Sequence, residues 1–419
     1  MAIDFTLTPE QRALQSGARQ FAREVLSGVR AATDMLPTAE QRFLATRPAY
    51  EAMVAAGYLR KCIPAPAGGD GNGLVDMAIM AEEFYSVNAS VTLTMLGTVL
   101  GLLPVLIGGT PEQCGRFLGP FLQKRGAPLA GFCSSEPGGS ANAGSPPPGE
   151  GVRTTARADG EEWVINGRKK WVSSATGWDR KGADLLCVVC RTGSSGSPGK
   201  DISVIAVERP ERGIVFERAI ESMGHRAHLV TEFAFEELRV PRSHVLGEQG
   251  AGLALSEASF TGTAALVGIF GVALMRAAFD FALHFARTER RGGIHPIIEH
   301  QAVGYALADA KTAIEAARYL SWRACHALDR QSPAAAELSV QAKVFGSETA
   351  VRVITDLMRV VGIDSYDRAL PLASLLQDAL ALPIFDGGNM GIRRRQLHNM
   401  IMQPGYDPLS ASGAAEGHP

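Results

Sequence analysis

The period of the hydrophobic pattern changes twice along the chain, and this is the strongest constraint on its fold. Apolar residues recur at helical spacing as far as about residue 126, beginning in TPEQRALQSGARQFAREVL, where Thr8 is the expected N-cap and Pro9 the first helical residue. Short alternating or β-branched runs such as ADLLCVVCRT and ISVIAVER follow, and their spacing predicts an antiparallel sheet or barrel. Helical spacing then returns in three long segments, 252–289, 299–330 and 333–360.

These three parts predict an α+β protein with cooperating domains, as expected for a chain of 419 residues. We expect a helical N-terminal domain over 1–126 and a central antiparallel β-domain over 127–248. A C-terminal helical bundle should follow over 249–404, and the polar tail over 405–419 is predicted to be disordered.

Composition argues against charged macromolecular partners. Lys and Arg number 41 against 43 Asp and Glu, so we expect no binding to nucleic acid or to an anionic membrane surface. The longest apolar stretches, Met95–Gly108 and Ala264–Met275, are interpreted as too short to cross a bilayer, and Pro104 interrupts the first. The N-terminal MAIDFTLTPEQ lacks the pattern of a secretory signal, so a cytoplasmic location is expected.

Six scattered cysteines are typical of reduced thiols in a cytosol. Cys187 and Cys190 form a single C-x-x-C, but on a strand residues three apart point to opposite faces, so a buried strand is favoured over a redox or metal site. His295 and His300 lie five residues apart without a carboxylate at ligand spacing, and we predict no metal.

The run LPIFDGGNMGIRRRQL contains the residue on which the function depends. Asp386 precedes a predicted helix, where an aspartate usually acts as a cap, and the residues alone favour that role over a catalytic one. If one helix covers both positions, Arg393 lies near the same face as Asp386. Arg394 and Arg395 then turn away from it, and a solvated face or a subunit contact is the favoured interpretation for both.

Several motifs resemble the acyl-CoA dehydrogenase superfamily in their order and spacing. They are FCSSEPGGSAN (132–142), INGRKKWVSSA (165–175), FEELRVPRSHVLGEQGAGL (235–253) and RRGGIHPIIEHQ (290–301). The resemblance extends to about residue 403. It implies an acyl-CoA dehydrogenase-like fold that ends in a four-helix bundle, bound FAD, and a homotetramer built as a dimer of dimers.

Within this superfamily the chain is most similar to the nitroalkane oxidase branch, because Phe-Asp-Gly-Gly (385–388) stands where acyl-CoA dehydrogenases usually carry a Tyr-Glu-Gly-Thr type run. The resemblance implies that Asp386 removes a proton from the substrate and that Arg393 assists it. Thr263 stands where that branch has a serine bonded to the aspartate. A threonine that bonds back to its own helix is an equally open reading.

The resemblance also implies the flavin contacts. Ser173 matches a hydroxyl that hydrogen-bonds the flavin ring, and Trp171 matches an aromatic side chain beside it. Gly387 and Gly388 are expected to allow close approach of the flavin. The remaining ring-lining positions are Phe132, Cys133, Ser134, Ser135, Ser140, Ala141, Asn142, Val172, Ile384 and Phe385.

A second set of residues is expected to hold the pyrophosphate and adenosine of FAD across the dimer, namely Arg291, His300 and Gln301. A surface arginine and a capped core histidine are the alternatives. Gly362 is the one good match to the family's adenine-side glycine run, in MRVVGIDSY.

The expected activity is an FAD-dependent oxidation of small neutral nitroalkanes to aldehydes or ketones, with release of nitrite and with O₂ reduced to H₂O₂. One alternative is a dehydrogenase of acyl-CoA or acyl-carrier-protein thioesters that passes electrons to an electron-transfer flavoprotein. Another is a flavin monooxygenase of the same fold, but such enzymes tend to lose the carboxylate that Asp386 provides.

Overall fold

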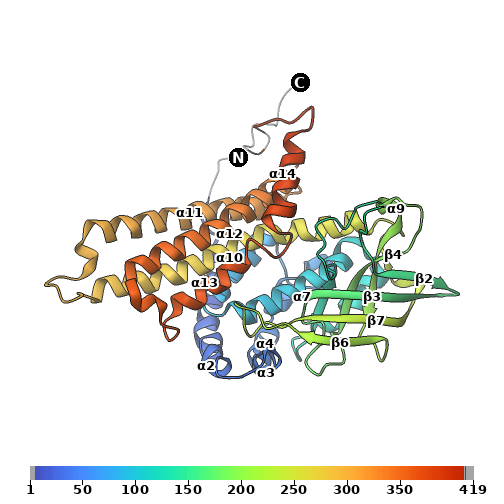
Figure 1. Cartoon of the computed structure of the whole chain (residues 1–419), viewed down its shortest axis with the longest axis horizontal. Coiled ribbons are helices and arrows are strands. Elements are labelled where there is room, and N and C mark those ends of the chain that lie inside the picture. The colour runs from blue at the N-terminus through green and yellow to red at the C-terminus, as the bar shows by residue number, and fades with distance from the viewer. Residues whose placement is uncertain (1–4, 147, 410, 412–419) are drawn as a thin grey trace.

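The chain folds into three parts: N-terminal helices, a central sheet and long C-terminal helices. The computed structural model describes residues 5–146, 148–409 and 411. Figure 1 shows the sheet at one end, the long C-terminal helices at the other, and the N-terminal helices against both. The N-terminal helices are α1 (Pro9–Phe21), α2 (Val29–Thr33), α3 (Ala39–Ala45), α4 (Arg47–Ala55), α5 (Tyr58–Lys61), α6 (Leu74–Tyr85), α7 (Ala89–Gly108) and α8 (Pro111–Leu118).

The first helix begins as its sequence predicts. Thr8 accepts a hydrogen bond from the backbone of Gln11, and the Gln11 side chain accepts one from the backbone of Thr8. This capping box satisfies two of the amide groups that a helix start leaves without partners, and Pro9 occupies the first turn at no cost.

The central part forms one eight-stranded sheet in the order β6-β7-β3-β2-β4-β5-β8, with β1 paired to β4. The strands are β1 (Ala130–Cys133), β2 (Thr155–Asp159), β3 (Glu162–Ser173), β4 (Leu185–Arg191), β5 (Ile202–Glu208), β6 (Ile214–Ala219), β7 (Val230–Pro241) and β8 (Val245–Leu246), and α9 (Pro198–Asp201) precedes β5. β1 and β2 both run parallel to β4, so the purely antiparallel prediction is wrong for these pairs. Long stretches of chain separate them from β4 and allow the return in the same direction.

Cys187 and Cys190 lie on β4, whose residues are buried on both faces except at its last position. Both thiols are free, and burial raises the pKa of Cys190 to about 12. The interpretation as a buried strand is therefore confirmed.

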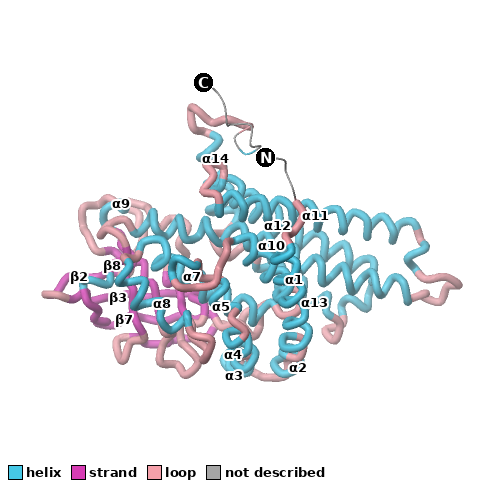
Figure 2. The backbone as a smooth tube through the Cα atoms, turned by 180° about the vertical axis from the view of Figure 1, so that it is seen from behind, coloured by secondary structure: helices cyan, strands magenta, loops and turns pink. Residues whose placement is uncertain are grey.

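The C-terminal part is helical, as predicted. Its members are α10 (Gly252–Thr288), α11 (Gln301–Asp329), α12 (Ala335–Val361), α13 (Pro371–Ala381) and α14 (Arg394–Ile401). Figure 2, seen from behind, shows α10, α11 and α12 side by side. The disorder expected for the tail is wrong at Tyr406, whose hydroxyl donates to Glu337 at 2.9 Å, whereas residues 410 and 412–419 lie outside the described part.

α7 and α10 are longer than the apolar runs seen in the sequence, with 20 and 37 residues. By length and composition both could cross a membrane, so the interpretation that these segments are too short is wrong. Two thirds of each apolar window is buried within the protein, which is typical of core helices.

Two features bring α7 and the bundle against their neighbours. A Cβ at Gly101 of α7 would lie 2.7 Å from the backbone of Ala130, so the helix approaches β1 as closely as a glycine allows. Glu82 and Glu83, both buried on α6, form ion pairs with Arg276 of α10. These contacts hold α7 against the sheet and α6 against α10.

Candidate active site

Asp386 lies in the turn between α13 and α14 and is not a helix cap. Its φ of 53° is in the left-handed region. A short π-helical turn (Asn389–Arg393) begins three residues later with Gly388 as its N-cap, and no side chain caps it. The carboxylate, 5% exposed, points instead toward α10 and Arg393.

Two side chains bind the carboxylate of Asp386, one at each oxygen. The hydroxyl of Thr263 on α10 lies 2.8 Å from Oδ1, and Nη2 of Arg393 lies 3.2 Å from Oδ2. The hydroxyl of Thr263 is also 3.2 Å from the carbonyl oxygen of Phe260, in its own helix. The structure therefore contains both contacts expected for this threonine, one to Asp386 and one back to the helix. A hydroxyl has one hydrogen, and the shorter distance and the negative charge favour donation to Asp386.

Arg393 is almost completely buried, with 1% of its side chain exposed. Its Nη2 also donates to the carbonyl oxygens of Asp386 and Phe260, at 2.8 and 3.0 Å. A Cβ at Gly387, where φ is 72°, would lie 3.0 Å from Nε of Arg393. This glycine therefore leaves room for the arginine. At Gly388 a Cβ would lie 3.0 Å from the carbonyl oxygen of Ile384.

Lys343 on α12 binds the turn that carries Asp386, and the sequence did not predict this contact. Its Nζ donates to the carbonyl of Leu382 at 3.2 Å and to the side-chain oxygen of Asn389 at 2.9 Å, one on each side of Asp386. Burial lowers the pKa of Lys343 to about 8, while the charge of Asp386 acts against this. The sequence carried one signal: helical spacing aligns Lys343 with Ser339 and Ser347 on a buried face.

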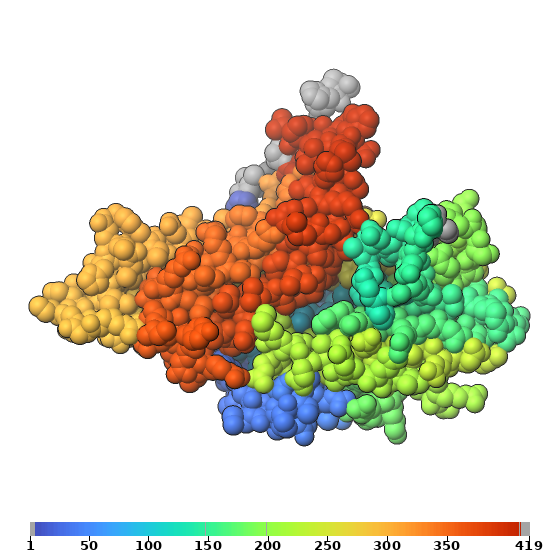
Figure 3. All heavy atoms as spheres, in the orientation of Figure 1, coloured from blue at the N-terminus to red at the C-terminus, as the bar shows by residue number. Residues whose placement is uncertain are grey.

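The two arginines after Arg393 are both exposed, as expected for a solvated face, and each also binds a partner within the chain. Arg394 forms an ion pair with Glu348 at 2.6 Å. Arg395 donates to the side chain of Asn142 at 3.1 Å and to the carbonyl of Ala141 at 2.5 Å. Figure 3 shows the C-terminal segment (red) beside the lobe that follows β1 (teal).

Ser173, at the end of β3, is bound to a histidine that sequence reasoning also missed. Its Oγ lies 3.0 Å from Nε2 of His228, and Nδ1 of His228 lies 3.0 Å from Oγ1 of Thr94 on α7. A Cβ at Gly97 would lie 3.1 Å from Cβ of Ser173. Burial lowers the pKa of His228 to about 3, so the imidazole is neutral at physiological pH.

The other expected ring-lining residues combine apolar and polar groups in a way that fits a flavin. Trp171 is 56% exposed beside Ser173, and Ile384 is 73% exposed beside the Asp386 turn. Phe132 is buried against Phe260 of α10, and Ser135 and Ser140 share a hydrogen bond. Exposed apolar side chains next to hydroxyl groups suit a planar ring with a polar edge. Cys133 and Val172 are buried in the sheet, and Ser134 is partly exposed.

The residues expected to hold the adenosine end lie far from Asp386 within the chain. Thr288 and Thr263 are on one helix, roughly 37 Å apart at 1.5 Å per residue, and Arg291 follows Thr288. Arg291 pairs with Asp364 at 2.9 Å, and a Cβ at Gly362 would lie 3.8 Å from it. His300 and Gln301 are exposed at the start of α11, so the core-histidine alternative is wrong.

Three family models together match most of the chain. They describe the N-terminal, middle and C-terminal domains of acyl-CoA dehydrogenase, at residues 8–125, 131–238 and 250–402. Members of this family are FAD-dependent flavoproteins. The short-chain specific acyl-CoA dehydrogenase of Bos taurus is 31% identical and covers 89% of this chain and 86% of its own length.

Nitroalkane oxidases match at higher identity. The enzyme of Podospora anserina is 42% identical over 98% of this chain and 99% of its own, and that of Fusarium oxysporum is 37% identical over 98% and 97%. The crystal structure of the Podospora enzyme superposes with a TM-score of 0.94, covering 98% of this chain and all of that one. A nitroalkane oxidase with an active-site Asp-to-Asn replacement, crystallised with 1-nitrooctane, also gives 0.94 at 36% identity over 98% of this chain and all of that one. The chain therefore belongs to the acyl-CoA dehydrogenase family, in the branch that contains the nitroalkane oxidases.

Proposed function

We propose that this protein is an FAD-dependent oxidase of small neutral nitroalkanes. The observation that carries the proposal is the buried carboxylate of Asp386, bound by Thr263 at one oxygen and by Arg393 at the other. In a nitroalkane oxidase studied for the roles of an aspartate and an arginine, these two residues are seven positions apart, the spacing of Asp386 and Arg393.

The arrangement suits removal of a proton from carbon. A nitro group acidifies the adjacent C–H, so a carboxylate of ordinary basicity is sufficient when it is held in place and shielded from water. Thr263 and Arg393 fix the orientation of Asp386, and the buried guanidinium favours negative charge nearby. Asp386 then takes up the α-proton on a carboxylate oxygen.

We place FAD beside Ser173 and Trp171, with the loop from Phe132 to Asn142 along its polar edge. Bound there, FAD would supply the acceptor for two electrons; with O₂ as the final oxidant and water as the source of the carbonyl oxygen, the overall products are an aldehyde or ketone, nitrite and H₂O₂. Arg395 ties this loop to the helix after Asp386, through Ala141 and Asn142, and so connects the cofactor side of the site to the base.

A thioester dehydrogenase is the main alternative. A thioester α-proton is less acidic, and a carboxylate arm shorter by one methylene would have to reach it. The identity is also lower, 31% to the bovine acyl-CoA dehydrogenase against 42% to the Podospora nitroalkane oxidase.

The test is anaerobic reduction of the flavin in the purified protein. Nitroethane should bleach the flavin absorbance, and butyryl-CoA at the same concentration should not. Product analysis after exposure to air should find acetaldehyde, nitrite and H₂O₂ from nitroethane. Bleaching by butyryl-CoA alone would overturn the proposal.

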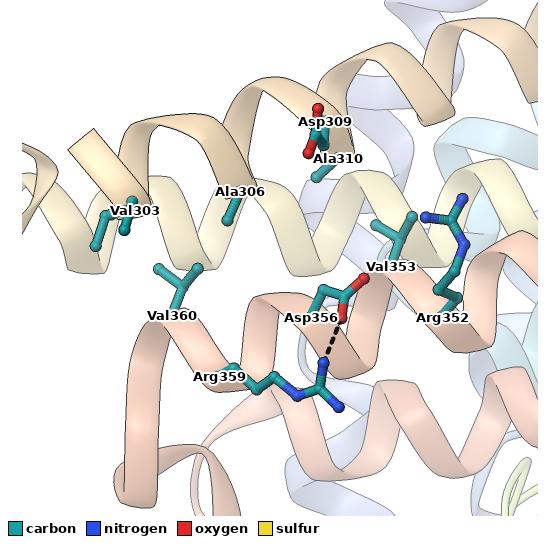
Figure 4. Close-up of a pocket in the computed structure, with 10 residues that line it drawn as sticks. Val303, Ala306, Asp309, Ala310, Arg352, Val353, Asp356, Arg359 and Val360 are labelled. Carbon is teal, nitrogen blue, oxygen red and sulfur yellow. Dashed lines mark hydrogen bonds and ion pairs between the residues drawn. The ribbon is translucent and has the colours of Figure 1, made fainter. Parts of the chain in front are cut away.

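We also propose a homotetramer in which Arg291, His300 and Gln301 meet the FAD of a partner subunit. A groove of about 340 Å³ between α11 and α12 supports an interface here, because its walls combine apolar side chains with charged ones that a partner could pair: Val303, Ala306 and Val360 with Asp309, Arg352, Asp356 and Arg359 (Figure 4). Tyr305, on the same helix, is 62% exposed. Sedimentation of the FAD-loaded protein at several concentrations tests this, since a monomer would overturn it.

The divisions at 126/127 and 248/249 and a cytoplasmic location complete the proposal. Each division falls between the segments matched by the family models, and the six cysteines are free. Limited proteolysis with mass spectrometry tests the divisions, and fractionation of cells that produce the protein tests the location.

A further inference from the structure

The hydroxyl of Ser173 is one end of a buried chain of hydrogen bonds. Ser173 Oγ lies 3.0 Å from Nε2 of His228, and Nδ1 of His228 lies 3.0 Å from Oγ1 of Thr94. Thr94 in turn lies 3.0 Å from the carbonyl oxygen of Ser90, one turn earlier in α7. His228 is 4% exposed and Thr94 is fully buried, so bulk water does not compete for the bond between them.

The direction of every bond in this chain follows from its last member. The carbonyl of Ser90 has no hydrogen, so the bond exists only if the Thr94 hydroxyl donates to it. Thr94 has no second hydrogen, so Nδ1 of His228 must donate to Thr94. A neutral imidazole carries one N–H, and burial keeps this histidine neutral by lowering its pKa to about 3. Nε2 is therefore an acceptor, and Ser173 must donate its hydrogen to it.

We infer that His228 is a positioning residue that turns the hydrogen of Ser173 away from the flavin, so that Ser173 presents an acceptor oxygen to the ring. The inference rests on the FAD placement proposed above. A flavin ring nitrogen that lacks hydrogen when oxidised carries an N–H when reduced. An acceptor oxygen beside that nitrogen favours the reduced cofactor, so the chain from Thr94 to Ser173 should raise the reduction potential of FAD.

The turn that carries His228 is itself held rigidly from three sides. The amide of His225 donates to Asp378 of α13, and the His225 ring bonds the hydroxyl of Tyr85 of α6 at 2.5 Å. The amide of Ala227 donates to the Ser90 hydroxyl at 3.3 Å. Phe385, next to Asp386, packs edge-on against the His225 ring. This contact joins the turn that carries His228 to the turn that carries Asp386. His228 is thus placed by backbone contacts that do not depend on Ser173.

The experiment is a redox titration of the FAD-loaded protein without any nitroalkane. His228→Leu removes the acceptor, so the Ser173 hydrogen becomes free to bond the oxidised ring, and the potential should fall. Ser173→Ala should lower it as well, by loss of the acceptor oxygen. We expect the reduced-to-oxidised equilibrium constant to fall by roughly 2- to 10-fold in each, the range of one hydrogen bond. The double variant should fall no further than the larger single effect.

Two further variants keep the test decisive if His228→Leu does not fold. Thr94→Val preserves shape but frees the imidazole to take the other tautomer, and it should lower the potential by a smaller amount. His228→Gln can still accept from Ser173 and donate to Thr94, and it should restore most of the wild-type potential. His244→Gln is the matched control, a buried histidine bonded to the carbonyl of Ala206, and it should leave the potential unchanged.

A potential that is unchanged or raised in folded, FAD-loaded His228→Leu or Thr94→Val would overturn the inference. If Ser173→Ala alone lowers the potential, the flavin lies beside Ser173 but His228 does not direct it. If no variant changes the potential, both the inference and the placement of the flavin are wrong. The nitroethane assay is independent of these outcomes, because the titration contains no substrate.

Discussion

The turn around Asp386 and the turn around His228 are both buried polar clusters, but the first is built around a charged group and the second around a neutral one. Asp386 carries a charge, and it receives the guanidinium of Arg393, the hydroxyl of Thr263 and the nearby ammonium of Lys343. His228 is neutral, and one donor and one acceptor are sufficient for it. A buried charge needs several compensating groups, whereas a buried neutral group needs only a defined orientation.

This difference predicts that substitutions in the two clusters have different consequences for stability and activity. Loss of one member of the charged cluster leaves an ion without compensation and should affect both stability and chemistry. Loss of one member of the neutral cluster should change the direction of a hydrogen bond and little else.

Asp386→Asn should abolish flavin reduction by neutral nitroethane while FAD stays bound, because the amide has no lone pair basic enough to take the proton. We expect a loss of at least about 10²- to 10⁴-fold in the rate of anaerobic bleaching, the range for a general base. Preformed ethyl nitronate, which has already lost the proton, should still reduce the variant. Turnover of neutral nitroethane near the wild-type rate would show that Asp386 is not the base.

Arg393→Met should reduce both activity and stability, because the carboxylate of Asp386 stays buried without its cation. Breaking a buried ion pair from one side costs about 3–5 kcal/mol. Arg393→Lys retains the charge but not all the bonds to Asp386 and Phe260, and it should lose less stability. Thermal unfolding and kcat/KM for nitroethane check this, and equal stability of the two variants would contradict it.

Gly387→Ala should cost about 1–3 kcal/mol, because φ is 72° and the new Cβ would lie 3.0 Å from Nε of Arg393. The displaced guanidinium should also lower kcat for nitroethane. Gly391→Ala is the matched control, since its Cβ would meet only the Ala141 side chain at 3.5 Å. Thermal unfolding of both variants decides, and a stable, fully active Gly387→Ala would show that Arg393 can move without consequence.

The neutral cluster should make the protein sensitive to acid. Burial lowers the pKa of His228 to about 3, so the unfolded chain binds more protons than the folded one between about pH 6.5 and 3, and stability falls as the pH falls through that window. At pH 5 this one histidine should cost about 2 kcal/mol.

His225, whose pKa burial lowers to about 4, contributes in the same direction, while the neighbouring Asp378, whose pKa burial raises to about 7, opposes both. The fall in Tm between pH 7.5 and pH 5 should therefore be smaller in His228→Gln than in the wild type. An equal fall in Tm in the variant and in the wild type would show that His228 is protonated at pH 5 in the folded protein.

Arg395→Ala and Arg394→Ala should have the smallest effects, because both guanidinium groups are exposed. Arg395 joins the helix after Asp386 to Ala141 and Asn142, so its loss should weaken FAD binding by roughly two- to fivefold. Arg394 contacts Glu348, away from that loop, and its loss should leave FAD affinity unchanged. Fluorescence titration of the apoprotein with FAD distinguishes the two, and equal affinities would contradict the role of Arg395.

Much of the base site was predictable because its signals are local. Asp386 and Arg393 are seven residues apart, and Thr263 matches a family position, so motif and resemblance identified all three. The predicted reason for their meeting was wrong, because Asp386 is in a left-handed turn outside the helix and Arg393 folds back over Gly387. A capping tendency is a local preference, and the tertiary contacts with Thr263 and Arg393 override it.

Lys343, His228 and Thr94 were not predicted, and the reason is distance along the chain. Each contacts a site residue that lies dozens of positions away, on another helix or strand, and a lone lysine, histidine or threonine has no pattern of its own. The adenosine-side residues show the same limit, since Arg291 pairs with Asp364 in the single chain while its expected partner lies across a dimer.

The amino-acid sequence was sufficient for the order of helical, strand and helical parts and for the capping box at Thr8, because hydrophobic period and capping act within a few residues. For Asp386 the residues alone favoured a cap, and the role of base came from the family resemblance. The parallel pairing of β1 and β2 with β4, the room that Gly387 gives to Arg393, and the hydrogen bond between Ser173 and His228 became visible only in the tertiary structure. These features depend on the packing of distant segments and on which buried polar groups must satisfy one another, and no local pattern records that.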